Sequence, residues 1–130
     1  MTTVLHFAEL ENNIVLRVLA VAKNDCLDSS GVFQETIGEN LCRRLTGSLH
    51  KWIECSNDGS VRKNSCSPGD IYDENMDGFY NPNSPQPSWV LDDNLRWQSP
   101  IPCPENVEGF VWIWDEPKLT WVKVKNTTLP

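Results

Sequence analysis

The sequence predicts an α+β fold that is mainly β and contains one amphipathic helix. Three observations carry this prediction: β-rich runs joined by an Asn-Asn dipeptide, one stretch with helical apolar periodicity, and three acidic turns bracketed by bulky residues. The amino-acid composition changes after Pro68-Gly69, since eight of the nine prolines and five of the six tryptophans follow that dipeptide. We therefore expect a hairpin, helix and second hairpin over residues 1–68, and Trp- and Pro-rich tandem β-hairpins over 69–130.

The first hairpin is expected over residues 4–22. The dipeptide Asn12-Asn13 tolerates the positive φ angles that a two-residue hairpin turn requires. With that loop Phe7 lies opposite Val18. The second strand is apolar on both faces, and we expect it to be the more buried of the two.

The helix is expected over residues 34–46, where charged side chains fill one side and Gly47 suits the position just after the C-terminus. Gly38 inside it lowers helix propensity by about 1 kcal/mol relative to alanine. We expect Cys42 to be buried and reduced on the apolar face. That face combines residues that recur every four positions with the cysteine beside them: Ile37, Leu41, Cys42 and Leu45.

A second hairpin is expected over residues 51–64, turning at Asp58-Gly59. The five cysteines include no C-x-x-C pair, which disfavours a structural zinc site. Free thiols are the default for such a chain. Cys55 and Cys66 flank the turn, however, and would form a disulfide after release from the cell if they oppose each other.

The tryptophan-rich region repeats one pattern three times, in which a bulky residue, an acidic pair and a closing aromatic form a hairpin with cross-strand partners. Two of the hairpins run on into proline, which fixes φ and removes a ladder donor, so we expect extended exits. Such short units need neighbours for stability. The units are Tyr72-Asp73-Glu74 closed by Phe79, Leu91-Asp92-Asp93 closed by Trp97, and Trp114-Asp115-Glu116 closed by Trp121.

Composition disfavours several classes of function. The formal charge is −7, and no basic run exceeds two residues, so nucleic-acid binding is not expected. No stretch is long and apolar enough to span a membrane, and the N-terminus has no secretory signal pattern, so we expect synthesis in the host cytoplasm. His6 and His50 are the only histidines and belong to no recognisable catalytic motif. We expect neither enzymatic activity nor a cofactor.

One motif resembles a metal loop. The run from Asp73 to Gly78 matches the first half of an EF-hand calcium loop, with Asp73, Asn75 and Asp77 as candidate ligands. Ser84 stands where a bidentate glutamate belongs, and prolines replace helical flanks. We therefore favour a plain acidic turn.

Several stretches together resemble small virion-associated proteins of marine tailed phages, particularly cyanophages. They include "HFAELENNIVLRVLAV", "ETIGENLCRRLTG" and, as the most specific, the Pro-x-Pro-Ser-Trp-Val-Leu run at 85–91. The resemblance covers nearly the whole chain and implies membership of the virion without assigning a place in the capsid or the tail.

We therefore expect a virion structural protein that decorates or cements the assembled particle, with other virion proteins as partners and self-association as a further option. Tryptophan is enriched where proteins meet partners. The alternative is a glycan-binding module for host attachment, which would present exposed, coplanar rings along a groove. The candidate partner-binding residues are Trp89, Trp97, Trp112, Trp114 and Trp121.

Overall fold

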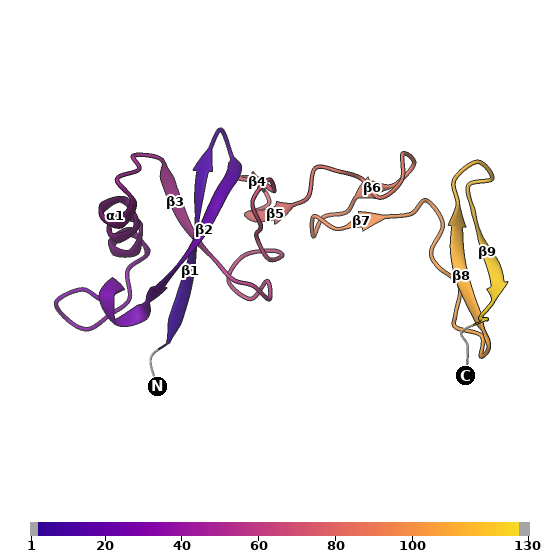
Figure 1. Cartoon of the computed structure of the whole chain (residues 1–130), viewed down its shortest axis with the longest axis horizontal. Helices are drawn as coiled ribbons and strands as arrows, with labels where there is room; N and C mark the ends of the chain where they lie inside the picture. The colour runs from indigo at the N-terminus through magenta and orange to yellow at the C-terminus, as the bar shows by residue number, and fades with distance from the viewer. Residues whose placement is uncertain (1–2, 128–130) are drawn as a thin grey trace. The chain divides into compact units, whose positions relative to one another are not determined.

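A computed structural model describes residues 3–127 and confirms the predicted class, since nine strands and one α-helix make up the described chain (Figure 1). All strand pairs are antiparallel. In chain order the elements are β1 (Val4–Glu11), β2 (Ile14–Ala22), the 3-10 turn η1 (Lys23–Cys26), α1 (Glu35–Thr46), β3 (Lys51–Cys55), β4 (Ile71–Asp73), β5 (Gly78–Tyr80), β6 (Val90–Leu91), β7 (Trp97–Gln98), β8 (Phe110–Asp115) and β9 (Thr120–Lys125).

The chain forms two compact units, and the division between them falls later than residue 68. The first unit extends to Pro82 and also includes Asp93–Leu95, while the second comprises Asn83–Asp92 and the chain from Arg96 onward. The first unit extends this far because β4 and β5, the first acidic hairpin, join its sheet, whose strand order is β3-β1-β2-β4-β5. The second unit contains the two-stranded sheets β6-β7 and β8-β9.

The β1–β2 hairpin turns at Asn12 and Asn13, which adopt φ angles of 53° and 63° as expected. The predicted register is wrong by one residue, because a bulge beyond Glu9/Leu10 inserts an extra residue in β2 and brings Phe7 opposite Leu19. The prediction that β2 is the more buried strand is also wrong. β1 lies between β2 and β3 in the sheet, and it contributes four consecutive buried residues.

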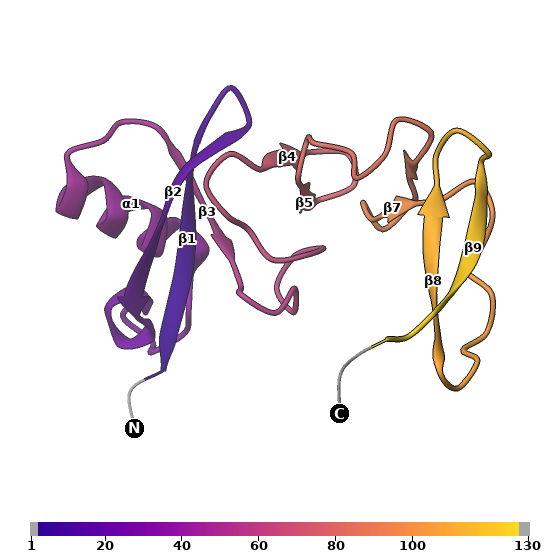
Figure 2. The same cartoon turned by 45° about the vertical axis from the view of Figure 1, so that its right-hand side comes forward.

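The sheet of the first unit is apolar on both faces. One face packs on α1, which lies alongside β1–β3 in both views (Figures 1 and 2). The opposite face has its own cluster, which draws on β5 as well as β1, β2 and β3. The core on the helix side consists of Phe7, Val21, Cys26, Cys42 and Trp52, and the opposite core of Ala8, Leu10, Val15, Ile53, Cys55 and Phe79.

The helix ends as expected at Gly47, whose φ is 73° and whose N–H donates to the Arg43 carbonyl at 2.7 Å. Cys42 is fully buried, as predicted, but Leu45 is 63% exposed. The buried face is instead centred on Cys42 and Gly38. A Cβ atom at Gly38 would lie 2.2 Å from the Phe7 ring, so the glycine allows helix and sheet to approach closely.

The predicted hairpin at 51–64 does not form. β3 pairs with β1, and the chain beyond Asp58-Gly59 makes no return strand. The guanidinium of Arg62 instead donates to the Glu54 carbonyl at 2.6 Å, in the place that a returning strand would need. The Cys55–Cys66 disulfide closes this loop.

Residues 93–95 complete the first unit. Leu95 is 6% exposed, and its Cδ1 would be 2.9 Å from a Cβ atom at Gly78. The side-chain amide of Asn64 donates to the carbonyls of Asn94 and Leu95, each at 3.0 Å, and Lys63 Nζ donates to the Asp93 carbonyl at 3.0 Å. The tip of the β6–β7 hairpin therefore belongs to the core of the preceding unit.

Candidate functional site

Three of the five predicted tryptophans form one cluster in the second unit. Trp114 and Trp121 are directly opposite on β8 and β9, with ring centroids 5.4 Å apart. Trp89 lies 6.1 Å from each of them. The ring planes meet at angles between 55° and 82°, an edge-to-face arrangement typical of a packed aromatic core.

All three predicted cross-strand pairs are confirmed. Tyr72 lies opposite Phe79, Leu91 opposite Trp97, and Trp114 opposite Trp121. The bulky residues thus bracket each acidic turn by packing across it.

The indole N–H groups tie the aromatic side of the β8–β9 hairpin to neighbouring chain. Trp114 Nε1 donates to Glu116 Oε1 at 2.8 Å, and this hydrogen bond is the main cause that lowers the pKa of the Glu116 carboxyl. Ser88 Oγ donates to the same oxygen at 2.7 Å. Trp121 and Trp112 donate to the carbonyls of the proline-rich segment 101–105, at 2.8 and 3.0 Å. These tryptophans therefore organise the unit internally.

The other side of the same hairpin is aliphatic and faces solvent. Side chains alternate along each strand, so the register separates the tryptophans of β8 and β9 from a set of Val and Ile residues on the opposite face. Val111 is 42%, Ile113 52% and Val124 39% exposed. This aliphatic face consists of the cross-strand pairs Val111/Val124 and Ile113/Val122.

The aliphatic face is the surface that sequence reasoning missed. The signal lies in the strict alternation of "FVWIWD" and "TWVKVK", in which Trp, Phe and Lys occupy one phase and Val and Ile the other. In the aromatic phase Trp114 is 9% exposed while Phe110 is 39% exposed, so that phase is partly covered and the tryptophans stay candidate partner-binding residues.

Two of the three candidate calcium ligands of the 73–78 turn, Asp73 and Asp77, form hydrogen bonds within the fold. Asp73 Oδ1 accepts the Met76 N–H at 3.0 Å. Asp77 Oδ1 accepts hydrogen bonds from the Tyr72 hydroxyl at 2.5 Å and Arg62 Nε at 2.9 Å, and these lower the pKa of Asp77, Tyr72 contributing most. Within residues 3–127 no three acidic, His or Cys side chains group as metal ligands would. The geometry matches an acidic turn clamped by arginine.

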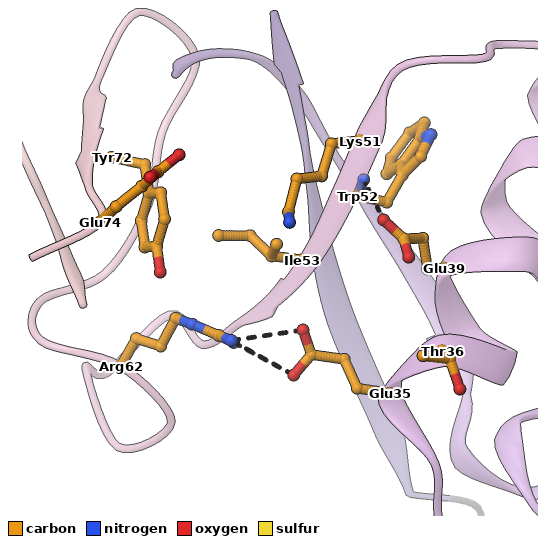
Figure 3. Close-up of a pocket in the computed structure, with 9 residues that line it drawn as sticks. All are labelled: Glu35, Thr36, Glu39, Lys51, Trp52, Ile53, Arg62, Tyr72 and Glu74. Atoms are coloured by element: carbon orange, nitrogen blue, oxygen red, sulfur yellow. Dashed lines mark hydrogen bonds and ion pairs between the residues drawn. The ribbon is translucent and has the colours of Figure 1, made fainter. Parts of the chain in front are cut away.

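A cleft of about 350 Å³ lies along the outer edge of β3, the edge on which no further strand of the described chain pairs (Figure 3). The Trp52 N–H donates to Glu39 Oε2 at 3.0 Å and the Glu54 N–H to Glu35 Oε2 at 3.4 Å, while Arg62 pairs with Glu35 at 3.3 Å. The carboxylates of α1 thus occupy the hydrogen-bonding positions that an added strand would use. Figure 3 shows Tyr72 and Glu74 opposite the helix side of this cleft.

A buried carboxylate forms the densest polar cluster of the first unit. Glu9, with its side chain 4% exposed, accepts hydrogen bonds from Arg17 Nε at 2.5 Å, from His50 Nδ1 at 2.9 Å and from the Ser48 hydroxyl. Burial raises the pKa of Glu9, but these three hydrogen bonds outweigh it and lower the pKa to about 2. Ser48 and Glu9 both meet the same ring nitrogen of His50, so the arrangement is not that of a nucleophile, base and orienting acid in series.

Comparison with known proteins finds no matching family model, no matching curated protein and no matching solved structure. Within the described residues, no helix has the length and apolar character needed to cross a bilayer.

Proposed function

We propose that this chain is a structural protein of a tailed-phage virion, which decorates or cements the assembled particle by docking the aliphatic face of β8–β9 onto another virion protein. The observation that carries the proposal is the exposure of Val111, Ile113 and Val124 on one side of a hairpin whose other side packs Trp114 and Trp121 against Trp89. Contiguous apolar surface rimmed by polar residues is typical of interaction sites.

The energetics favour a partner that is present in many copies. Full burial of one Val or Ile side chain is worth about 1.5–3 kcal/mol. The three exposed members are roughly half covered already, so each gains about 1 kcal/mol and the three together about 3 kcal/mol. The loss of translational and rotational freedom on association costs at least that much, so a single contact of this kind is weak. A contact of that strength reaches high occupancy where repeated sites are linked, as on a particle surface.

The disulfide agrees with a final location outside the reducing cytosol. Cys55 and Cys66 are bonded, and such bonds persist mainly in oxidising surroundings. Synthesis in the host cytoplasm followed by oxidation in the released virion accounts for this bond.

The ring geometry favours docking over glycan binding. A stacking platform needs coplanar, exposed rings, whereas the Trp89, Trp114 and Trp121 planes are inclined by 55° to 82°. Two of these three indoles also direct their N–H groups to neighbouring protein oxygens.

The test is incorporation of Ile113→Ser and Val124→Ser into particles of the phage that carries the gene, measured by co-sedimentation and quantified against wild type. Leu49→Ser is the matched control, because Leu49 is 91% exposed in the first unit. We expect both hairpin variants to keep the near-UV circular dichroism of the tryptophan cluster and to lose at least ten-fold in incorporation, with the control unchanged. Equal incorporation of all variants would overturn the proposal, and intact incorporation with reduced adsorption to host cells would favour glycan binding.

A further inference from the structure

The edge strands of the two units differ in whether side chains satisfy their outward N–H and C=O groups. In the first unit, side chains close the edge of β3. Glu39 accepts the Trp52 N–H (Figure 3), and Glu35 accepts the Glu54 N–H while Arg62 donates to the Glu54 carbonyl. Such blocking is how natural sheets avoid unwanted strand addition.

In the described part of the second unit, side chains do not close the outer edge of β8 in this way, although the Phe110 N–H at its start donates to the Val107 carbonyl at 3.0 Å. The Asn126 N–H donates to the Gly109 carbonyl at 2.8 Å, so this pair is hydrogen-bonded across the hairpin. Hydrogen-bonded and non-bonded pairs alternate in an antiparallel ladder. The N–H groups of Val111 and Ile113 therefore face β9, and those of Trp112 and Trp114 face the opposite edge. Within residues 3–127, no strand pairs along that edge.

The charges distinguish the two edges of the hairpin. β9 carries Lys123 and Lys125, and lysine on an edge strand hinders pairing. β8 is uncharged from Phe110 to Trp114, contains no proline, and has Asp115 at its end. The β8 edge is thus built like the interior of a sheet.

We propose that β8 pairs antiparallel with β8 of a second copy of this chain, which produces a four-stranded sheet in the order β9, β8, β8, β9. A two-fold pairing centred on Trp112 sets Phe110 opposite Trp114 and uses the outward N–H groups of Trp112 and Trp114, while Phe110, whose N–H donates to the Val107 carbonyl, contributes its carbonyl as acceptor. Asp115 then lies opposite Gly109 of the second copy, so the two aspartates do not face each other. The pairing also joins the two aliphatic faces into one wider surface.

The distribution of charge supports a second copy as the occupant. The second unit contains five acidic and four basic side chains, a formal charge of −1, which leaves −6 of the chain's −7 to the first unit. Two second units therefore meet without strong repulsion, whereas two first units repel. The inference does not depend on which virion protein the aliphatic face contacts.

Amide hydrogen exchange on the full chain tests the pairing directly. The protein carries Cys103→Ser, because Cys103 is exposed and free and would otherwise link copies covalently. We expect the amides of Trp112 and Trp114 to slow at least ten-fold as the protein concentration rises from about 5 µM to 1 mM, while those of Val111 and Ile113, already bonded to β9, change little. Sedimentation equilibrium over the same range should report a dimer.

Two substitutions at Trp112 separate the contribution of its outward backbone N–H from that of its indole. Trp112→Thr and Trp112→Pro both remove the indole, but only proline removes the donor that faces the second copy. We expect Trp112→Pro to raise the dimer dissociation constant at least ten-fold above that of Trp112→Thr. A chain that stays monomeric at 1 mM, or a dimer without added protection at Trp112 and Trp114, would overturn the proposal. Should the proline variant lose its hairpin, the exchange experiment on the Cys103→Ser protein still decides.

Discussion

Replacing the buried carboxylate at the centre of the first unit should produce a loss of stability that depends on pH in a defined way. Glu9→Gln keeps the size of the side chain and removes its charge, so it imitates the protonated form of Glu9. The three donors Arg17, Ser48 and His50 remain in place around a neutral acceptor.

The expected magnitude follows from the depressed pKa. The pKa of Glu9 falls from 4.5 to about 2 on folding. At about 1.4 kcal/mol per unit, the ionised form contributes about 3 kcal/mol to the free energy of unfolding near neutral pH. A depressed carboxyl pKa stabilises above the unfolded value, so this contribution is complete above pH 4.5 and is lost as the pH falls toward 2. The variant, which does not titrate there, should therefore differ most from wild type at pH 7 and least near pH 2.

Urea unfolding followed at 222 nm, where α1 contributes strongly, measures this difference at pH 7, 4.5, 3 and 2.5. Glu11→Gln is the matched control, because the Glu11 side chain is 54% exposed and its contact with His50 Nε2 is 3.7 Å long. We expect the control to change the free energy of unfolding by less than about 1 kcal/mol. An equal loss for Glu9→Gln at every pH, or no loss at pH 7, would refute the reasoning.

Three further predictions concern the core and the cysteines. Gly38→Ala should destabilise by about 1–2 kcal/mol in thermal unfolding, because the clash with Phe7 outweighs the gain of about 1 kcal/mol in helix propensity; a stabilised variant would contradict the close approach. Cys66→Ser should lower the free energy of unfolding by about 3 kcal/mol, as expected for an 11-residue separation, and a reductant should then have no further effect on the variant. In thiol labelling of native protein, Cys103 should react first, and Cys42 only on unfolding, since burial raises its pKa to about 11; early modification of Cys42 would refute its placement.

Short-range sequence patterns were sufficient to predict the elements that neighbouring residues determine. The helix, its end at Gly47, the Asn12-Asn13 turn and the three bracketed hairpins follow from periodicity, capping and cross-strand pairing. Each of these depends on residues within a few positions of one another.

One of the errors lies within the first hairpin, and the others arise where distant residues decide. The bulge beyond Glu9 changes the β1–β2 register, and no turn signal announces it. Arg62 replaces a return strand because Glu35 of the helix is there to pair with it. From the sequence, Gly38 only lowers helix propensity, whereas in the structure the Phe7 ring packs where a Cβ atom of residue 38 would lie.

The candidate site shows the same division. The sequence predicts that tryptophans pair across the last hairpin, and its alternation separates an aromatic from an aliphatic face, but the alternation alone does not say which face stays exposed. The face is decided by segment 101–105, whose carbonyls receive the Trp112 and Trp121 N–H groups and so cover the aromatic side.

The three residues Asp93–Leu95 bear on how the protein is made. Domains generally fold in order as the ribosome releases them, the N-terminal one first. Here the first unit lacks its buried Leu95 until the ribosome has passed the start of the second unit, so a nascent chain released only to Pro82 leaves Gly78 without the Leu95 side chain and the Asn64 amide without two of its carbonyl acceptors. The two units therefore mature in overlapping stages of translation, and a chain that stalls between residues 82 and 93 presents an incomplete core to the cell's proteases.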